Sequence, residues 1–239
     1  MLRRATPDSL VAEGVRLHRS FETEAALGRY VQALAADSRH YRALWHAAAE
    51  SVVLGMTAED ESRAFSRYAA AEAYARRALE VNPGGTEAMG WLAVALGRKA
   101  LSAGVREAVR LAEEIRSMAL QAIELDPQSP LGHHVLGQWH AEVRRVGGVQ
   151  RLIARAVLGG KSFGEASWDM AETHLARSTE LEPESLVHRI ELARVYQETG
   201  REELARSGYE WVLAQPLREP TDAGLQSRAR RLLADLGSA

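Results

Sequence analysis

The stretch Tyr74-Ala-Arg-Arg-Ala-Leu-Glu-Val-Asn-Pro83 decides the fold of this chain, because it recurs twice. The later copies are Met118-Ala-Leu-Gln-Ala-Ile-Glu-Leu-Asp-Pro127 and His174-Leu-Ala-Arg-Ser-Thr-Glu-Leu-Glu-Pro183. Each copy ends an amphipathic helical pattern with an acidic or amide residue and a proline, and a new apolar helical pattern begins within a few residues. A repeated helix–proline–helix pattern predicts a stack of helical hairpins, which presents an extended surface to a partner.

The rest of the chain also has a helical pattern. Apolar residues recur every three or four positions, and no stretch alternates as a strand would. The segment 183–217 has about 34 residues, the length of a tetratricopeptide repeat. We therefore predict an all-α fold: a single domain over residues 1–239, built as a right-handed superhelix of tetratricopeptide-like hairpins. The expected units cover 7–38, 39–83, 84–127, 128–183 with an insertion at 144–165, and 184–217, and a C-terminal capping helix covers 221–236.

Prolines and glycines set the expected helix boundaries within these units. They predict a helix at 58–81, a long helix at 105–125 and a helix at 186–200. Thr221 and Asp222 are expected to cap the final helix, because their side chains can accept hydrogen bonds from its first N–H groups.

Composition limits the class of protein. The chain has 239 residues, of which 46% are hydrophobic, and this is enough for a folded core. Its formal net charge of −2 argues against binding nucleic acid through phosphates. The absence of cysteine excludes disulfides, thiolate zinc sites and cysteine nucleophiles. Alanine and arginine are abundant and the only lysines are Lys99 and Lys161, a usage typical of a GC-rich genome, so we expect a bacterial protein.

No apolar run approaches the ~18 residues of a membrane span. Residues 1–8 lack the apolar core of a signal peptide. We therefore expect a soluble, cytoplasmic protein; a removed export signal would instead place it in the periplasm.

Two patterns could carry chemistry, and each fits a structural role better. Gly159-Gly-Lys-Ser162 resembles the end of a phosphate-binding loop, but Arg155 stands where that motif needs a glycine, and the context is helical. His133 and His140 share a helix face about 10 Å apart along the axis, too far for one metal. We therefore predict no catalytic residue, no metal, no cofactor and no enzyme. A hidden enzyme would need a deep pocket with perturbed carboxylates.

The partner surface follows from the repeat register. In a tetratricopeptide stack the first helix of each pair lines the concave side. That lining is mixed here, and it suits a peptide with apolar anchors and an acidic group. It differs from the lysine–asparagine lining with which chaperone adaptors hold a C-terminal carboxylate, so we exclude that class of partner. The candidate groove residues are Arg42, Trp45, Arg98, His134, Gln138, Arg194 and Gln197.

A basic cluster lies in and beside the insertion: Arg144, Arg145, Arg151 and Arg155. In the segment 149–158, two of these arginines lie one helical turn apart with apolar residues opposite. Such a short helix can lie on an anionic membrane or hold an acidic partner. Alternatively, it docks on the array with its arginines in solvent.

Three segments carry a resemblance to a known family: Tyr41-Arg-Ala-Leu-Trp-His-Ala-Ala-Ala49, Leu136-Gly-Gln-Trp-His140 and Val149-Gln-Arg-Leu-Ile-Ala-Arg-Ala-Val-Leu158. Together with the unequal repeat units, they make residues 40–236 similar to the regulator of microtubule dynamics family. Animal members are associated with microtubules and with mitochondrial and endoplasmic-reticulum membranes through protein contacts. The resemblance implies an interaction scaffold.

We therefore predict a non-catalytic scaffold that binds a protein or peptide in its concave groove, without nucleic acid and without a small-molecule substrate. The alternative is a peripheral membrane scaffold that uses the basic helix at 149–158.

Overall fold

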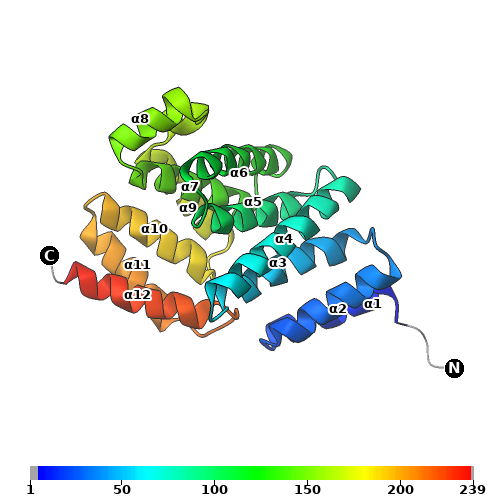
Figure 1. The fold of residues 1–239 in the computed structure, drawn as a ribbon. Helices are drawn as coiled ribbons and strands as arrows, with labels where there is room; N and C mark the ends of the chain where they lie inside the picture. Colours follow the sequence, from blue (N-terminus) through cyan, green and yellow to red (C-terminus); the bar gives the residue numbers. More distant parts are fainter. Residues whose placement is uncertain (1–4, 238–239) are drawn as a thin grey trace.

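The structure, a computed structural model, describes residues 5–237, apart from the side chains of Arg155 and Val157. The described residues form α-helices and one short 3₁₀ helix with no strand, which confirms the all-α class. Successive helices pack as hairpins that follow one another along a superhelix (Figure 1). The elements are α1 (Pro7–Arg19), α2 (Thr23–Ala36), α3 (Tyr41–Met56), α4 (Glu61–Val81), α5 (Thr86–Ala100), α6 (Val105–Leu125), α7 (Pro130–Arg145), α8 (Gly148–Val157), η1 (Lys161–Glu165), α9 (Trp168–Leu181), α10 (Leu186–Glu198), α11 (Glu202–Ala214) and α12 (Asp222–Leu236).

The three recurring stretches mark the ends of α4, α6 and α9. Asn82, Asp126 and Glu182 follow the last helical turn with positive ψ, outside the helical region, because a following proline disfavours helical backbone. In the first two, a side-chain oxygen accepts a hydrogen bond from the N–H of Gly84 or Gln128, two residues on. The pattern therefore stops one helix and turns the chain toward the next.

Hydroxyl side chains begin several of the helices. The Thr6 hydroxyl oxygen accepts from the N–H of Ser9, and Pro7 occupies the first helical position of α1. Ser129 and Ser167 cap α7 and α9 in the same way. These bonds satisfy N–H groups that have no partner inside the helix.

Two predicted boundaries differ from the structure. The helix predicted at 58–81 begins at Glu61, because the side chain of Asp60 caps it there. The helix predicted at 186–200 ends at Glu198, two residues early.

The start of α12 also differs from prediction. Thr221 occupies the N-cap position, but its side chain makes no capping bond. Instead the buried Asp222 carboxylate accepts the N–H groups of Arg218 and Glu219 at 2.8 and 2.9 Å. This carboxylate therefore fixes the loop before α12 rather than the first turn of the helix.

Close helix packing depends on paired small and large residues. A Cβ at Gly14 would overlap the ring of Tyr30, which is fully buried between α1 and its neighbours. A Cβ at Gly137 would likewise overlap Leu175 of α9. Because the glycines leave this space free, the large side chains fill the core without voids.

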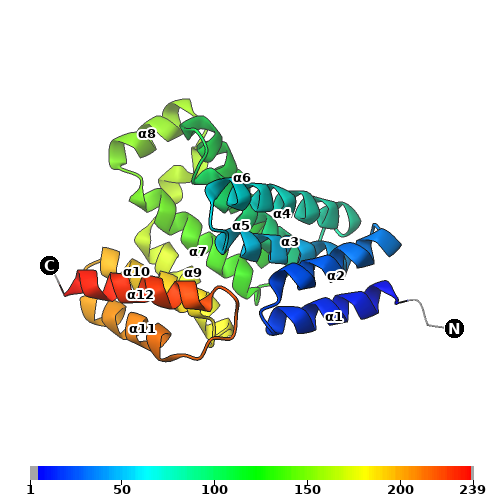
Figure 2. The same ribbon diagram turned by 60° about the horizontal axis from the view of Figure 1, so that its bottom comes forward.

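The superhelix bends until its two ends meet. Figure 2 shows α1 beside the loop that leads into α12. At this meeting point His18, in the last turn of α1, contacts Glu219 of that loop at 2.8 Å. The helical hairpins between α1 and α12 therefore surround a concave space that this contact closes on one side.

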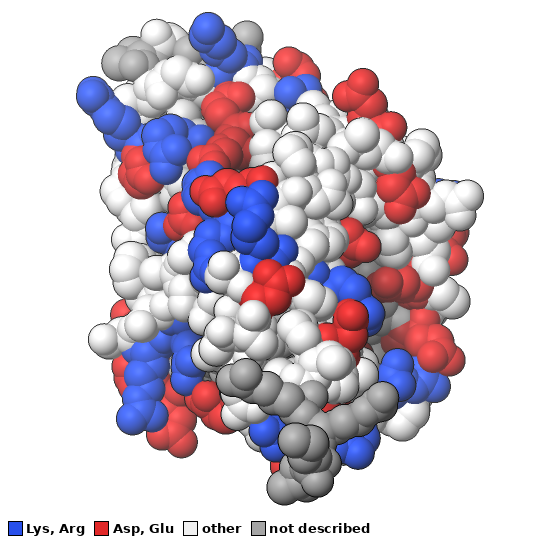
Figure 3. Space-filling model, turned by 90° about the vertical axis from the view of Figure 1, so that its right-hand side faces the viewer, with Lys and Arg blue, Asp and Glu red and all other residues white. Residues whose placement is uncertain are grey.

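Charged side chains of both signs are mixed on the outer surface. On the face shown in Figure 3, Lys and Arg side chains lie among Asp and Glu side chains, and neither sign dominates. Ion pairs such as Arg67 with Glu24 and Arg76 with Glu114 link neighbouring hairpins. Exposed pairs of this kind stabilise the fold only slightly.

Candidate partner-binding groove

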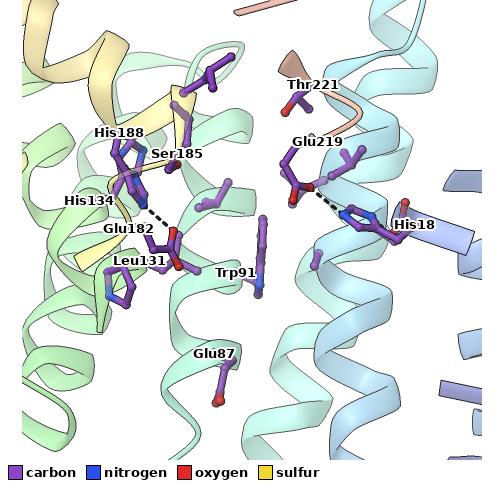
Figure 4. Close-up of a pocket in the computed structure, with 18 of the residues that line it drawn as sticks. His18, Glu87, Trp91, Leu131, His134, Glu182, Ser185, His188, Glu219 and Thr221 are labelled. Atoms are coloured by element: carbon purple, nitrogen blue, oxygen red, sulfur yellow. Dashed lines mark hydrogen bonds and ion pairs between the residues drawn. The ribbon is translucent and has the colours of Figure 1, made fainter. Parts of the chain in front are cut away.

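A cavity of about 850 Å³ opens on the concave side of the superhelix. Its walls come from α1, α3, α5, α7 and α10 and from the loop before α12 (Figure 4). A concave site of this size is within the usual range for ligand pockets. We use the name "groove" for this cavity below.

One side of the groove is aromatic. Trp45 stacks on His46 with ring centroids 3.6 Å apart, and His46 stacks on Tyr30 at 5.1 Å. Burial, together with neighbouring positive charges, lowers the pKa of His46 to about 4, so the ring is neutral at pH 7. Trp91 lies in the middle of the groove, between His18 on one side and His134 on the other (Figure 4). The partly exposed rings of Trp45 and Trp91 offer apolar surface at little conformational cost, and the buried Tyr30 supports His46 from behind.

His18 closes the groove where the two ends of the superhelix meet. Its Nδ1 lies 2.8 Å from Glu50 of α3, and its Nε2 lies 2.8 Å from Glu219. The hydrogen bonds to Glu219 and Glu50 raise the pKa of His18 to about 10 against the opposing effect of burial. His18 is therefore a cation at pH 7 and donates to both carboxylates.

A pair of histidines forms the opposite wall. The Nδ1 atoms of His134 and His188 are 3.0 Å apart, so one donates a hydrogen bond to the other. The Nε2 of His188 lies 3.0 Å from Glu182. Burial, and then the neighbouring His188, lower the pKa of His134 to about 3. His134 is therefore neutral at pH 7.

The groove wall carries more carboxylates than guanidinium groups, and each of these carboxylates is engaged within the protein. Their partners are His18, His188, Arg218, a tyrosine hydroxyl or backbone N–H groups. The carboxylates are Glu50, Glu87, Asp126, Glu182, Glu184, Glu219 and Asp222.

Three of the seven predicted groove residues, Trp45, Arg98 and His134, line the groove. Arg42 lies outside the wall, 57% exposed and 3.9 Å from Asp8. The groove therefore includes only part of the predicted surface. It also includes residues of the loop before α12, which were not predicted.

The other three residues are occupied by internal contacts. The hydroxyl of Tyr209 donates to the side-chain oxygen of Gln197 at 2.6 Å. Arg194 lies 2.9 Å from the buried Glu191, and Gln138 hydrogen-bonds to the same carboxylate. Burial would raise the pKa of Glu191, but nearby arginines outweigh it and hold this pKa at about 2. Gln138 therefore links α7 to α10, Gln197 links α10 to α11, and Arg194 pairs within α10, and none of the three lines the groove.

Sequence reasoning missed the residues that close the groove. His18 and Glu219 are 201 residues apart, and the loop 218–222 was expected only to precede a capping helix. Small rotations between successive hairpins add up along a superhelix, and no local pattern reports their sum. The acidic loop residues give no signal that could have revealed the contact.

The basic insertion patch is largely used by the fold. Arg145 pairs with Glu198 at 2.7 Å and belongs to α7 rather than to the insertion. Arg151 donates to the carbonyl oxygens of Val143, Arg144 and Val146, at the end of α7. These carbonyls have no partner within the helix, so Arg151 acts as its C-terminal cap.

The remaining two arginines of the patch differ. Arg144 lies over the ring of Trp168, with its guanidinium carbon 6.0 Å from the ring centroid. The side chain of Arg155 lies outside the described residues. The prediction that the arginines of a docked insertion helix face solvent is therefore wrong for Arg151.

The apolar side of α8 faces outward. Val149, Leu152 and Ile153 are 70%, 63% and 50% exposed, whereas Ala154 is buried. Apart from Ala154, these apolar side chains therefore do not dock on the array. None of the helices in the described part of the chain has both the length and the apolar character that crossing a membrane requires.

The segment Gly159-Gly-Lys-Ser162 runs from the turn after α8 into the first two residues of η1. The N–H and the hydroxyl of Ser162 both donate to the carboxylate of Glu113, at 3.0 and 2.9 Å. A carboxylate in this position would repel a phosphate. Among the described residues, no three histidine, aspartate or glutamate side chains converge as metal ligands.

Comparison with known proteins identifies relatives along nearly the whole chain. A family model described as "Regulator of microtubule dynamics protein 1-3" matches residues 10–237 and so extends beyond the predicted 40–236. Regulator of microtubule dynamics protein 1 of Mus musculus is 24% identical over 236 residues, covering 97% of this chain and 75% of that protein. Regulator of microtubule dynamics protein 3 of Mus musculus is 29% identical over 151 residues, covering 62% of this chain but 31% of that protein. The chain therefore spans about a third of the length of this second relative.

Solved structures share the fold. TTC0263, a thermophilic tetratricopeptide protein of Thermus thermophilus, superposes with a TM-score of 0.68 at 21% identity, over 96% of this chain and 100% of that chain. A monomeric mutant of IFIT1 with Gppp-AAAA gives a TM-score of 0.55 at 17% identity, over 98% of this chain and 56% of that chain. At these identities the likeness shows a tetratricopeptide-like superhelix and nothing about ligands.

Proposed function

The chain belongs to the regulator of microtubule dynamics family, and we propose that it is a non-catalytic scaffold whose groove binds a segment of a partner protein. The observation that carries this proposal is the aromatic and aliphatic lining of the groove on the concave side. Helical-repeat proteins use concave surfaces of this kind for binding.

The lining suits apolar anchor residues of a peptide. Trp45, Trp91, Val94 and Leu131 are only partly buried, so their free surface is available to a partner. Burying one large apolar side chain of the partner there would contribute roughly 1.5–3 kcal/mol. Two or three such anchors are typical of the hot spots that dominate protein interfaces.

Protein rather than nucleic acid is the favoured partner. The groove wall holds seven carboxylates against the guanidinium groups of Arg98 and Arg218 and the imidazolium of His18. A phosphate backbone needs an excess of positive charge, and this wall has the opposite balance.

Site-specific photo-crosslinking tests this proposal. A crosslinking amino acid replaces Leu131 in the groove, and a control probe replaces Glu180, an exposed residue of α9. The captured segment is then synthesised, and its dissociation constant is measured with purified protein by fluorescence anisotropy. We expect capture from position 131 only.

A steric variant supplies the decisive comparison. Ala49→Arg fills the groove from α3, and Ala223→Arg adds the same side chain to the exposed face of α12, outside the groove. We expect the first variant to weaken binding at least about tenfold and the second to leave it unchanged. Equal binding by both variants would show that the segment binds elsewhere.

A second candidate function follows from the outward apolar face of α8. A short helix with Val149, Leu152 and Ile153 exposed can lie in the interface of a lipid bilayer. This role would make the chain a peripheral membrane scaffold without changing the groove.

Liposome flotation tests this second function. The double variant Leu152→Ser/Ile153→Ser removes most of the apolar face, and Leu101→Ser removes an even more exposed leucine in the α5–α6 turn as a control. We expect the wild type and the control, but not the double variant, to float with anionic vesicles. A wild type that stays with the soluble fraction would exclude the membrane role.

A further inference from the structure

Helix α5 presents one continuous row of side chains to the groove. Glu87, Trp91, Val94 and Arg98 all line it, at spacings of four, three and four residues. This spacing places them on one helix face over about 16 Å. The row has a carboxylate at one end, apolar groups in the middle and a guanidinium at the other end.

Arg98 is the guanidinium of this wall that lacks a carboxylate. Among the described residues, its side-chain hydrogen bond goes to the sulfur of Met56, at 3.5 Å. A thioether is a weak acceptor, so the five donors of the guanidinium are almost unused. By contrast, Arg218 on the same wall pairs with Glu184 at 2.7 Å.

The carboxylates of the groove do not supply the missing partner. Glu87 accepts the hydroxyl of Tyr41 at the far end of the row, and Glu50 and Glu219 are held by His18 at the junction. Arg98 contacts the apolar Met56 and lies one helical turn from Val94, and its polar neighbours on this side, the Tyr68 hydroxyl and the neutral His134, carry no negative charge. A partly buried guanidinium in such surroundings binds a carboxylate more strongly than it would in water.

We propose that Arg98 is the subsite for a carboxylate of the bound peptide segment, with an apolar side chain of that segment against Trp91 and Val94. This inference rests on the proposed function and names the chemistry of its partner: an extended or helical segment with an aspartate or a glutamate near an apolar anchor. Glu87 at the other end of the row orients the segment, because it repels a second acidic group there.

Selection from a displayed library of random linear peptides tests the inference. Wild type, Arg98→Lys, Arg98→Gln and Arg98→Glu serve as targets, with Arg106→Gln as a matched control on the exposed side of α6. Peptides are retained only when Ala49→Arg abolishes their binding, which assigns them to the groove. We expect the wild type, Arg98→Lys and the control to select acidic residues beside an apolar anchor, and Arg98→Glu to select lysine or arginine at that position.

A double-mutant cycle then measures the contact. For one enriched peptide, replacing its carboxylate residue by the amide should weaken binding to the wild type about tenfold or more. Against Arg98→Gln the same replacement should change binding less than about twofold, because the partner charge is already absent.

The outcomes separate the two proposals. Groove-bound peptides without an acidic preference, or equal losses against wild type and Arg98→Gln, would overturn the Arg98 inference and leave the proposed function standing. If no peptide depends on the groove, the proposed function fails and the inference fails with it.

Discussion

His18 and His134 lie on opposite sides of the same groove, with Trp91 between them (Figure 4). Hydrogen bonds to Glu219 and Glu50 raise the pKa of His18 to about 10, whereas burial lowers the pKa of His134 to about 3. The contact that joins the two ends of the superhelix therefore needs a positively charged His18. The opposite wall of the groove needs a neutral His134. Burial decides the protonation of a histidine only where no carboxylate offers a direct hydrogen bond.

Replacing each histidine by lysine should give the largest difference in stability between the two sites. His134→Lys forces an ammonium group into the buried wall, and we expect a loss of about 3–5 kcal/mol in the free energy of unfolding. His18→Lys keeps a cation between two carboxylates, and we expect a change below about 1 kcal/mol. Urea unfolding followed by circular dichroism measures both, and equal losses would contradict the assignment of charge.

Removing the charge at the junction should have the next largest effect. His18→Ala leaves the buried Glu50 without its cation, and we expect a loss of about 2–3 kcal/mol. The double variant His18→Ala/Glu50→Gln should be more stable than His18→Ala, because it no longer buries an unpaired carboxylate. A double variant that is less stable than either single variant would show that Glu50 has another role.

The free energy of unfolding should decrease on both sides of neutral pH, with His134 contributing to the acid side and His18 to the alkaline side. Because the pKa of His134 is lowered in the fold, its contribution is complete above about pH 6.5 and is lost as the pH falls toward about 3. Because the pKa of His18 is raised, its contribution is complete below about pH 6.5 and is lost as the pH rises toward about 10. We expect a maximum near pH 6.5 and a change of about 1–2 kcal/mol on each side.

Variants assign the two sides of this pH dependence. His18→Gln should flatten the alkaline side and leave the acid side unchanged. His134→Leu should reduce the acid side only in part, because His46, His140 and His174, with pKa values lowered to about 4, also contribute to it. Thermal unfolding across the pH range provides the measurement, and a shift of both sides by one variant would contradict independent sites.

The smallest expected change in stability distinguishes the two carboxylates that contact His18, Glu50 and Glu219. Glu219 is 59% exposed, whereas Glu50 is buried, so Glu219→Gln should cost only about 0.5 kcal/mol. The same change should lower the pKa of His18 clearly, since Glu219 makes the largest contribution to it. Titration of the His18 ring by NMR measures this shift, and an unchanged pKa would show that Glu50 alone holds the proton.

Much of the fold could be predicted from the sequence because nearby proline, glycine and capping residues set most helix boundaries. The helix at 105–125 has the predicted bounds, and the residues before each proline end helices as expected. The errors in helix boundaries and caps arose where a side chain forms a hydrogen bond to a different backbone segment than the one we predicted. Asp222 binds the preceding loop instead of capping α12, and Asp60 starts α4 later than predicted.

The groove was predicted only in part, for a different reason. Trp45, Arg98 and His134 follow the repeat register, so their positions could be predicted from spacing. Gln138 and Arg194 follow the same register, but a buried carboxylate on α10 holds both. Periodicity reports which face of a helix a residue occupies and gives no information on the contact that residue makes.

The contact between His18 and Glu219 also changes how this protein should unfold. In a linear repeat array each unit touches only its neighbours, and the terminal units fray independently. Here one side-chain ion pair, His18 with Glu219, also links the first hairpin to the loop before α12. Breaking this ion pair should therefore raise amide hydrogen exchange at the end of α1 and at the start of α12 together, by a small factor.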